Sequence, residues 1–149
     1  MASMADLGAP LFIDVDGLRI RYVGSSGGGG GTAVLMVSPF PESLFAFDHI
    51  WADLSQAAPL VALDLPGFGQ SEGRPELMTS QAMGTFVTKA LTALGLQRVH
   101  AIGPDVGTSA LLFAASQRPD RFESGWLRRD RRCAHRCRAK GHHRRPVDR

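Results

Sequence analysis

The chain has 149 residues, of which 44% are hydrophobic and 21% are charged, and this size and balance suit one domain with a buried core. Residues 1–124 contain 7 Lys/Arg and 12 Asp/Glu whereas residues 125–149 contain 10 Lys/Arg and 2 Asp/Glu, so the net charge of +3 does not describe a uniformly basic protein. Both cysteines lie in residues 125–149, which excludes a disulfide framework elsewhere. No apolar run is long enough to span a membrane, and residues 1–10 lack the features of a secretory signal. We therefore expect a cytoplasmic protein.

Strands at 11–15 and 18–23 are predicted to form a β-hairpin. Asp16 and Gly17 between them are a residue pair typical of tight two-residue hairpin turns. The arginines of the second strand, including Arg21, alternate with apolar side chains. We therefore expect the face that carries them to be solvated.

Short apolar strands and helices alternate along the rest of the chain. The segment at 24–31 contains five consecutive glycines, which predicts a flexible connector. A phosphate-binding loop is disfavoured because no Lys-Ser/Thr pair follows the glycines. In chain order the predicted elements are a strand at 33–37, a helix at 43–57 with an apolar stripe that includes Ile50, a strand at 60–63, a helix at 80–94 that ends before Gly95, a strand at 99–102 and a helix at 108–117. This order predicts an α/β fold with a mostly parallel, doubly wound sheet that starts with an antiparallel hairpin.

A sequence of the form G-x-D-x-G connects a predicted buried strand directly to a helix at 103–107. This is the strand–turn–helix context of a nucleophile elbow, with Asp105 in the position of the nucleophile. Gly103 and Gly107 leave room for the close passage of strand and helix that such a turn requires. Because a helix N-terminus favours an anion, the carboxylate is expected to stay ionised and able to attack. The alternative is a turn-forming aspartate in some other doubly wound protein.

Four segments together resemble the N-terminal part of the α/β-hydrolase superfamily, in the branch that contains epoxide hydrolases and haloalkane dehalogenases. They are the hairpin at 11–23, S-P-F-P-E-S at 38–43, D-L-P-G-F-G-Q-S at 64–71 and G-P-D-V-G at 103–107. The resemblance covers only the first part of the family's fold. We therefore expect a flexible segment at 1–10, a partial α/β-hydrolase domain at 11–124 and a basic, disordered tail at 125–149.

The resemblance implies that Asp105 attacks an electrophilic carbon of a small-molecule epoxide or alkyl halide and forms an ester. It also implies an oxyanion hole made of the backbone N–H groups of Phe40 and Val106. Water activated by a histidine would then cleave the ester, with an acidic residue orienting that histidine. The scheme needs no metal and no cofactor.

The sequence departs from the family's pattern at several positions. Ser38-Pro39 stands where the family usually has His-Gly, and Pro104 stands where it usually has His. Val106 replaces the tryptophan that dehalogenases and many epoxide hydrolases place after the nucleophile, which disfavours dehalogenation. The only tyrosine, Tyr22, falls on the predicted hairpin, so the tyrosines that protonate an epoxide oxygen in the family have no counterpart.

No catalytic base is assigned. In the family the histidine lies far downstream of the nucleophile, whereas 44 residues follow Asp105 here, and His49 and His100 fall in a predicted helix and a predicted strand. We therefore expect the fold to stop before its later strands and the chain to be inactive alone. The strand at 99–102 would then form an exposed apolar edge, and the helix at 108–117 would lose half of the surface that it should cover.

Three hypotheses account for the basic tail at 125–149. The abrupt change in composition favours a frameshift in a GC-rich gene. Alternatively, the Lys/Arg residues bind nucleic acid or anionic surfaces without specificity, through phosphates. In the third hypothesis zinc is bound, although the spacing of the candidate ligands is looser than in structural zinc sites. Those ligands are Cys133, Cys137, His142 and His143.

Other prominent side chains are interpreted as structural. Asp64 ends a strand before a turn, where its carboxylate can accept backbone N–H bonds, and Ser38 and Ser71 are expected in turns rather than on an elbow. Phe45, Phe47 and Trp51 are expected to belong to the core rather than to a substrate cage.

Overall fold

The computed structural model describes residues 7–25 and 31–124. Most of the glycine run and the whole basic tail lie outside the described residues. The frameshift, zinc and nucleic-acid hypotheses for the tail therefore also fall outside them. The strands are β1 (Leu11–Val15), β2 (Leu18–Ser25), β3 (Ala33–Val37), β4 (Leu60–Leu63), β5 (Val99–Ile102) and β6 (Phe122–Ser124). The α-helices are α1 (Asp48–Ala57), α2 (Ser80–Ala93) and α3 (Val106–Gln117), and the short 3-10 helices are η1 (Leu44–Phe47), η2 (Pro75–Leu77) and η3 (Pro119–Arg121).

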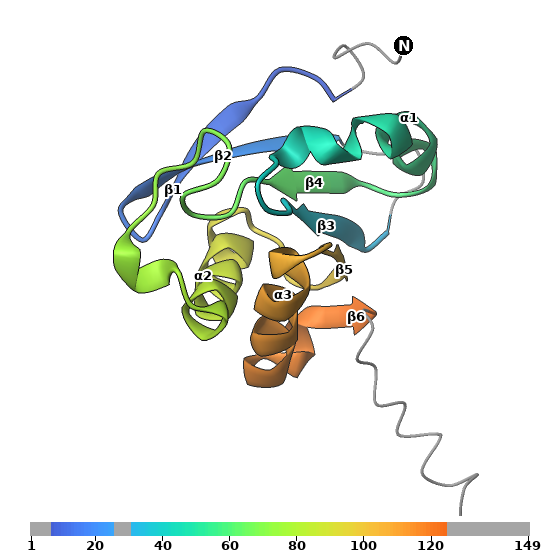
Figure 1. Ribbon diagram of the computed structural model, residues 1–149. Helices are drawn as coiled ribbons and strands as arrows, with labels where there is room; N and C mark the ends of the chain where they lie inside the picture. The colour runs from blue at the N-terminus through green and yellow to red at the C-terminus, as the bar shows by residue number, and fades with distance from the viewer. Residues whose placement is uncertain (1–6, 26–30, 125–149) are drawn as a thin grey trace, which may run out of the picture.

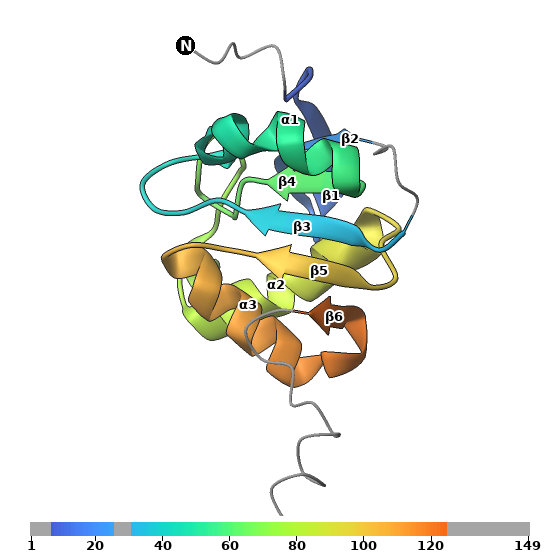
Figure 2. The same cartoon turned by 90° about the vertical axis from the view of Figure 1, so that its right-hand side faces the viewer.

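The six strands form one sheet in the order β1-β2-β4-β3-β5-β6. β1 and β2 form the antiparallel hairpin, and β2 is also antiparallel to β4. The strands β4, β3, β5 and β6 are parallel and lie side by side in Figure 2. The predicted α/β class, with a mostly parallel sheet and an antiparallel start, is confirmed.

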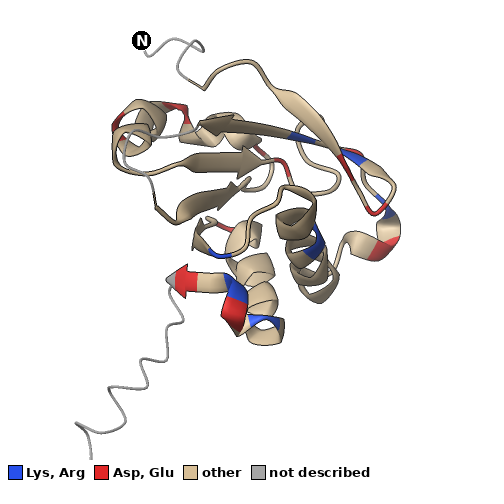
Figure 3. Cartoon of the chain, turned by 180° about the vertical axis from the view of Figure 1, so that it is seen from behind, with Lys and Arg blue, Asp and Glu red and all other residues tan. Residues whose placement is uncertain are grey.

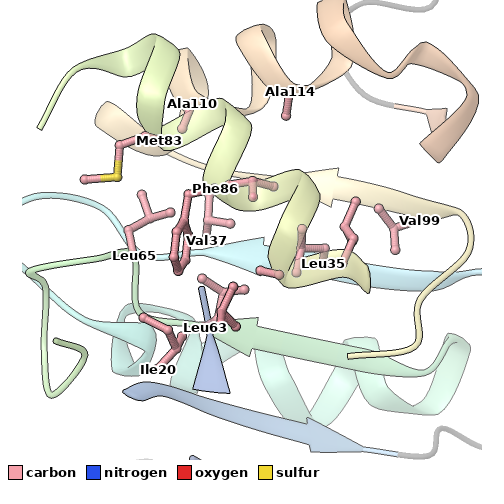
Figure 4. Close-up of a cluster of buried hydrophobic side chains, with 14 of the residues drawn as sticks. Ile20, Leu35, Val37, Leu63, Leu65, Met83, Phe86, Val99, Ala110 and Ala114 are labelled. Atoms are coloured by element: carbon pink, nitrogen blue, oxygen red, sulfur yellow. The ribbon is translucent and has the colours of Figure 1, made fainter. Parts of the chain in front are cut away.

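α2 and α3 cover one face of the sheet, and α1 covers the other (Figure 1). The core under α2 contains Phe86 from the helix and Leu35, Val37 and Leu63 from the sheet (Figure 4). Burying each large apolar side chain contributes about 1.5–3 kcal/mol. Because β3, β4 and β5 contain no charged residue, the charged side chains lie on the hairpin, the loops, the helices and β6 (Figure 3).

The core under α1 confirms the structural interpretation of the aromatic residues in this region. Trp51 and Phe47 are 2% and 4% exposed, and Phe45 packs against them. Leu7, within the segment expected to be flexible, is 2% exposed in the same cluster. Ile50 is 46% exposed, so its predicted place on the buried stripe is wrong. The reason is that 44–47 form the 3-10 helix η1, whose tighter winding shifts the buried face at the start of α1.

The expectation that the strand at 99–102 would form an exposed edge is wrong. Phe122–Ser124 forms β6 and pairs in parallel with β5, so that Val99 lies opposite Phe122. A strand of three residues directly after η3 is too short to give a periodic signal in the sequence. α3 begins two residues earlier than predicted, at Val106.

The expectation that Arg21 is solvated is also wrong. Arg21 is 3% exposed, because the loop that follows β4 covers its side of β2 and supplies Asp64 as a buried partner. That partner lies 43 positions away in the sequence, beyond the reach of a period-2 pattern. Within residues 7–25 and 31–124, no helix combines the length and the apolar character needed to cross a membrane.

Candidate functional site

Asp105 occupies a strained turn between β5 and α3. Its backbone angles are φ 52° and ψ −124°, in a region that residues with a side chain rarely adopt. Such a conformation costs on the order of 1–3 kcal/mol and persists only where the surroundings enforce it. The residue is exposed, and it precedes the first turn of a 12-residue helix. Its carboxylate is therefore presented to solvent at a helix N-terminus, where the dipole favours a negative charge.

Gly103 and Gly107 make this turn sterically feasible. A Cβ on Gly103 would lie 2.6 Å from Val37 Cγ2 and 2.7 Å from Leu111 Cδ1. A Cβ on Gly107 would lie 2.8 Å from the same Val37 methyl group and 3.2 Å from the Val37 carbonyl oxygen. β3 and the start of α3 thus approach each other so closely that a side chain at either position would force neighbouring atoms to shift.

Phe40 reaches Asp105 from the loop that follows β3. Its backbone N–H donates a hydrogen bond to Asp105 Oδ2 at 3.2 Å. β3 and β5 are adjacent parallel strands, so the loops after them meet at the same edge of the sheet. The Phe40–Pro41 peptide bond is cis.

The Phe40 side chain is 62% exposed, and its ring meets that of Phe68 edge to face, with 5.9 Å between the ring centroids. Phe68 comes from the loop after β4, so three loops at one sheet edge contribute to this surface. The D-L-P-G-F-G-Q-S segment at 64–71 contains Phe68, but no local pattern predicts its contact with Phe40.

Val106, the second expected oxyanion donor, is the first residue of α3. Backbone N–H groups in the first turn of a helix have no partner within the helix, which makes them available to an oxygen atom at this end. The Val106 side chain packs against the core under α2. In the same turn the Thr108 hydroxyl donates a hydrogen bond to the Gly103 carbonyl oxygen, which links the two arms of the elbow.

Asp64 is a buried structural residue, as its sequence context predicted. Its carboxylate is fully buried and accepts hydrogen bonds from the backbone N–H groups of Leu44 at 2.7 Å and Gln70 at 3.0 Å. Arg21 forms an ion pair with it at 2.6 Å, a partner that the sequence did not reveal.

Ser38 and Ser71 belong to the same buried network. The Ser38 hydroxyl accepts a hydrogen bond from the Leu65 N–H at 3.0 Å. The Ser71 hydroxyl accepts from the Arg21 N–H and donates to the Asp64 carbonyl oxygen, both at 2.9 Å. Neither hydroxyl lies on an elbow, in agreement with the sequence, and both hold backbone segments together inside this network.

The two histidines of the described residues lie in regular elements rather than on a loop at this sheet edge. His49 is exposed near the start of α1. His100 is half-buried in β5, opposite Val34 of β3 and Ser124 of β6. No group of three or more His, Cys, Asp or Glu side chains suited to a metal ion occurs in the described part of the chain.

A surface cavity of about 380 Å³ lies between the hairpin turn and α2. Its lining includes Asp16, Phe86 and Lys89, and no residue of the elbow or of the Phe40 loop. The cavity is therefore separate from the Asp105 site.

Known proteins are similar to this chain in both sequence and fold. The sequence profile of the family described as alpha/beta hydrolase fold matches residues 32–129. A dihydrolipoyllysine-residue acetyltransferase component of the acetoin cleaving system of Cupriavidus necator is 36% identical over 113 residues, which are 76% of this chain and 30% of that protein. A soluble epoxide hydrolase of Corynebacterium sp. (strain C12) is 28% identical over 109 residues, which are 73% of this chain and 37% of that protein.

Solved structures give the same result. The haloalkane dehalogenase DatA from Agrobacterium tumefaciens C58 superimposes with a TM-score of 0.71 at 27% identity, over 82% of this chain and 42% of that chain. The epoxide hydrolase CorEH superimposes with a TM-score of 0.71 at 26% identity, over 77% of this chain and 40% of that chain. The chain spans less than half the length of these relatives.

Proposed function

This chain belongs to the family described as alpha/beta hydrolase fold, and from that premise we propose that Asp105 is a nucleophile that attacks a small electrophilic substrate. One observation carries the proposal: an exposed carboxylate stands on a strained turn between β5 and α3 and receives the Phe40 N–H at 3.2 Å. Strain at a non-glycine residue is typical of functional positions. The similarity to epoxide hydrolases and dehalogenases supports the same chemistry.

The proposed step is the opening of an epoxide by Asp105. Since the Phe40 N–H engages Oδ2, we assign the attack to Oδ1. A bond forms between Oδ1 and an epoxide carbon, and the bond from that carbon to the ring oxygen breaks. The ring oxygen then takes a proton from a solvent water molecule, which leaves as hydroxide. Oδ2 then becomes the carbonyl oxygen of the ester. The N–H groups of Phe40 and Val106 are the proposed donors for the negative charge that this oxygen would carry during hydrolysis.

An epoxide is favoured over an alkyl halide as the substrate. Val106 follows the nucleophile and has no side-chain N–H group to bind a departing halide ion. Tyr22 belongs to β2 and packs against the core, so we assign it no role in protonating the epoxide oxygen.

We propose further that this chain completes the first half of the reaction and retains the ester. Hydrolysis of the ester needs a base beside it. Of the described histidines, His49 lies in α1 and His100 in the middle of β5, so neither is assigned that role. The alternative of a non-catalytic chain that binds nucleic acid rests on residues outside the described ranges, and no described contact favours it.

The test is covalent labelling of the full chain with styrene oxide, followed by intact-mass and peptide mass spectrometry. We expect one adduct of the mass of the epoxide on the peptide that contains Asp105, and no adduct in the Asp105→Asn variant. Asp53, which is exposed on α1, serves as an internal control and is expected to stay unmodified. A folded chain that gains no adduct, or an Asp105→Asn variant that gains the same adduct, would contradict the proposal.

A further inference from the structure

Asp64 holds the loop that carries Phe40, and we propose that it acts as a positioning residue for the Asp105 site, with Arg21 as its charge partner. The proposal rests on the proposed function of Asp105. It adds that a buried ion pair on the far side of the loop determines where the Phe40 N–H lies. The loop is defined here as residues 38–44.

Both ends of this loop are attached to the last residue of β4 and to the two residues that follow it. At its start the Ser38 N–H donates to the Leu63 carbonyl oxygen at 3.1 Å, and the Ser38 hydroxyl accepts from the Leu65 N–H at 3.0 Å. At its end the Leu44 N–H donates to Asp64 Oδ1 at 2.7 Å. Phe40 is 62% exposed, so burial of its side chain contributes little to fixing the loop. The attachments at the two ends therefore set the position of the Phe40 N–H.

The Asp64 carboxylate is suited to act as a rigid acceptor. Arg21 binds Oδ2 with both Nε and a terminal nitrogen at 2.6 Å, and the Gln70 N–H donates to the same oxygen at 3.0 Å. Oδ1 is directed to Leu44. The side chains of Arg21 and Asp64 are 4% and 0% exposed, so water does not compete for these bonds. Hydrogen bonds to an ionised acceptor are shorter and stronger than neutral ones.

Gly69 shows that the chain closes tightly over this pair. Its φ is +53°, and a Cβ there would overlap the Asp64 carboxylate and lie 2.7 Å from the Arg21 guanidinium. The turn after β4 thus seals the pair from solvent because position 69 has no side chain. The same turn brings Phe68 to the ring of Phe40, which joins the seal to the surface beside Asp105.

A pair of double variants separates a positioning role from a general structural one. Arg21→Met/Asp64→Leu fills the buried volume but removes the acceptor for the Leu44 N–H. Arg21→Met/Asp64→Asn has the same net charge and keeps an acceptor oxygen. Replacing a buried ion pair by apolar residues of similar size is often tolerated, so folded protein is expected. Lys89→Met, which breaks the exposed pair with Asp16, is the control for loss of an ion pair elsewhere.

The experiment measures amide hydrogen exchange in the loop 38–44 and the rate of styrene oxide labelling of Asp105, in the full chain. For Arg21→Met/Asp64→Leu we expect exchange at Phe40 and Leu44 to accelerate by about 10- to 100-fold and labelling to slow by about 10-fold, while exchange at Met36 in β3 stays unchanged. Lys89→Met should stay within about 3-fold of the parent chain on both measurements. The Asp64→Asn counterpart keeps the acceptor oxygen but loses the charge, so both of its effects should be clearly smaller than those of the Leu variant.

Unchanged exchange across 38–44 in a folded Arg21→Met/Asp64→Leu variant would overturn the proposal, as would equal effects of the Leu and Asn variants. If the parent chain is not labelled, the proposed nucleophile fails, yet the exchange data still decide the role of Asp64. If neither double variant folds, exchange in the parent chain tests the attachment of Leu44 to Asp64. The Leu44 amide must then be protected from exchange to a degree similar to the Met36 amide. Exchange of Leu44 as fast as that of the exposed Gly73 would disprove the attachment.

Discussion

The backbone N–H of Phe40 donates a hydrogen bond to the carboxylate of Asp105 at 3.2 Å, although the two residues are 65 positions apart in the sequence. The contact follows from the strand order, because β3 and β5 are neighbours and both point their carboxyl ends at the same edge. Each residue is placed by a different loop, and the packing below them fixes both. The predictions that follow test that packing and the charges around it.

Replacing Asp105 separates backbone strain from chemistry. Asp105→Gly removes a side chain from a residue at φ 52°, ψ −124°, so it should relieve strain. Asp105→Asn keeps the side-chain shape and therefore the strain. After allowance for the greater flexibility of glycine in the unfolded chain, the Gly variant should be more stable than the Asn variant by about 0.5–2 kcal/mol. Urea denaturation followed by circular dichroism measures the difference, and equal midpoints would show that the turn is not strained.

The close approach of β3 to α3 predicts a coupled pair of substitutions. Gly107→Ala places a Cβ 2.8 Å from Val37 Cγ2 and should cost about 1–3 kcal/mol through overpacking. Val37→Ala removes two methyl groups from a fully buried side chain and should by itself lower the unfolding free energy by about 1–3 kcal/mol.

In the double variant the new methyl group enters the space that Val37 leaves. Its cost should therefore be smaller than the sum of the two single costs by at least about 0.5–1 kcal/mol. A double-mutant cycle on urea-denaturation free energies gives this difference. Strict additivity would mean that the turn moves to accommodate the Cβ, contrary to the geometry.

The sheet could be predicted from the sequence because its signals are local. The hairpin depends on Asp16 and Gly17, which both have positive φ as a tight turn requires. β3, β4 and β5 are short apolar runs between turn formers, and all three have the predicted bounds. Gly95, predicted to end the second helix, has φ +70° directly after the last turn of α2.

What the sequence could not reveal depends on contacts between distant segments. Arg21 matches a solvated arginine in an alternating strand, and only the fold places Asp64 over it. β6 has three residues, too few for a period to be detected. At the site, the G-x-D-x-G pattern indicated Asp105 and its glycines, whereas the edge-to-face contact of Phe40 with Phe68 needed the relative placement of two loops.

The exposed pair of Asp16 and Lys89 predicts a pH effect of definite sign. The pKa of the Asp16 carboxyl lies below its usual value, mainly because Lys89 donates a hydrogen bond to it at 2.8 Å, with smaller attractions from Lys89 and Arg74. A carboxyl whose pKa is lower in the folded state than in the unfolded state favours folding above its unfolded pKa. That contribution is lost as the pH falls through the lowered folded-state pKa.

Lys89→Met should therefore raise the pKa of Asp16 towards its usual value, as measured by carbon NMR of the carboxyl groups. Asp120 is an internal control, since a hydrogen bond from Arg118 lowers its pKa and Lys89 is not involved. An unchanged titration of Asp16 in Lys89→Met would show that the ion pair does not persist in solution.

The buried pair of Arg21 and Asp64 should respond to substitution very differently from that exposed pair. Arg21→Met leaves the fully buried Asp64 carboxylate without a counter-charge. Asp64→Leu likewise leaves the buried Arg21 guanidinium without a counter-charge. Each single variant should lose about 3–5 kcal/mol of unfolding free energy. Arg21→Met/Asp64→Leu removes both charges and should recover most of that loss.

Urea denaturation of the two single variants, the double variant and Lys89→Met gives the comparison. Lys89→Met should denature close to the parent chain, because its ion pair is exposed to water and screened by salt. If the single variants at Arg21 and Asp64 lost as little unfolding free energy as Lys89→Met, water would have to reach the buried pair in solution. If the double variant were less stable than both single variants, removing the second charge would cost stability even without its partner, and an unpaired buried charge would not be the cause of the loss.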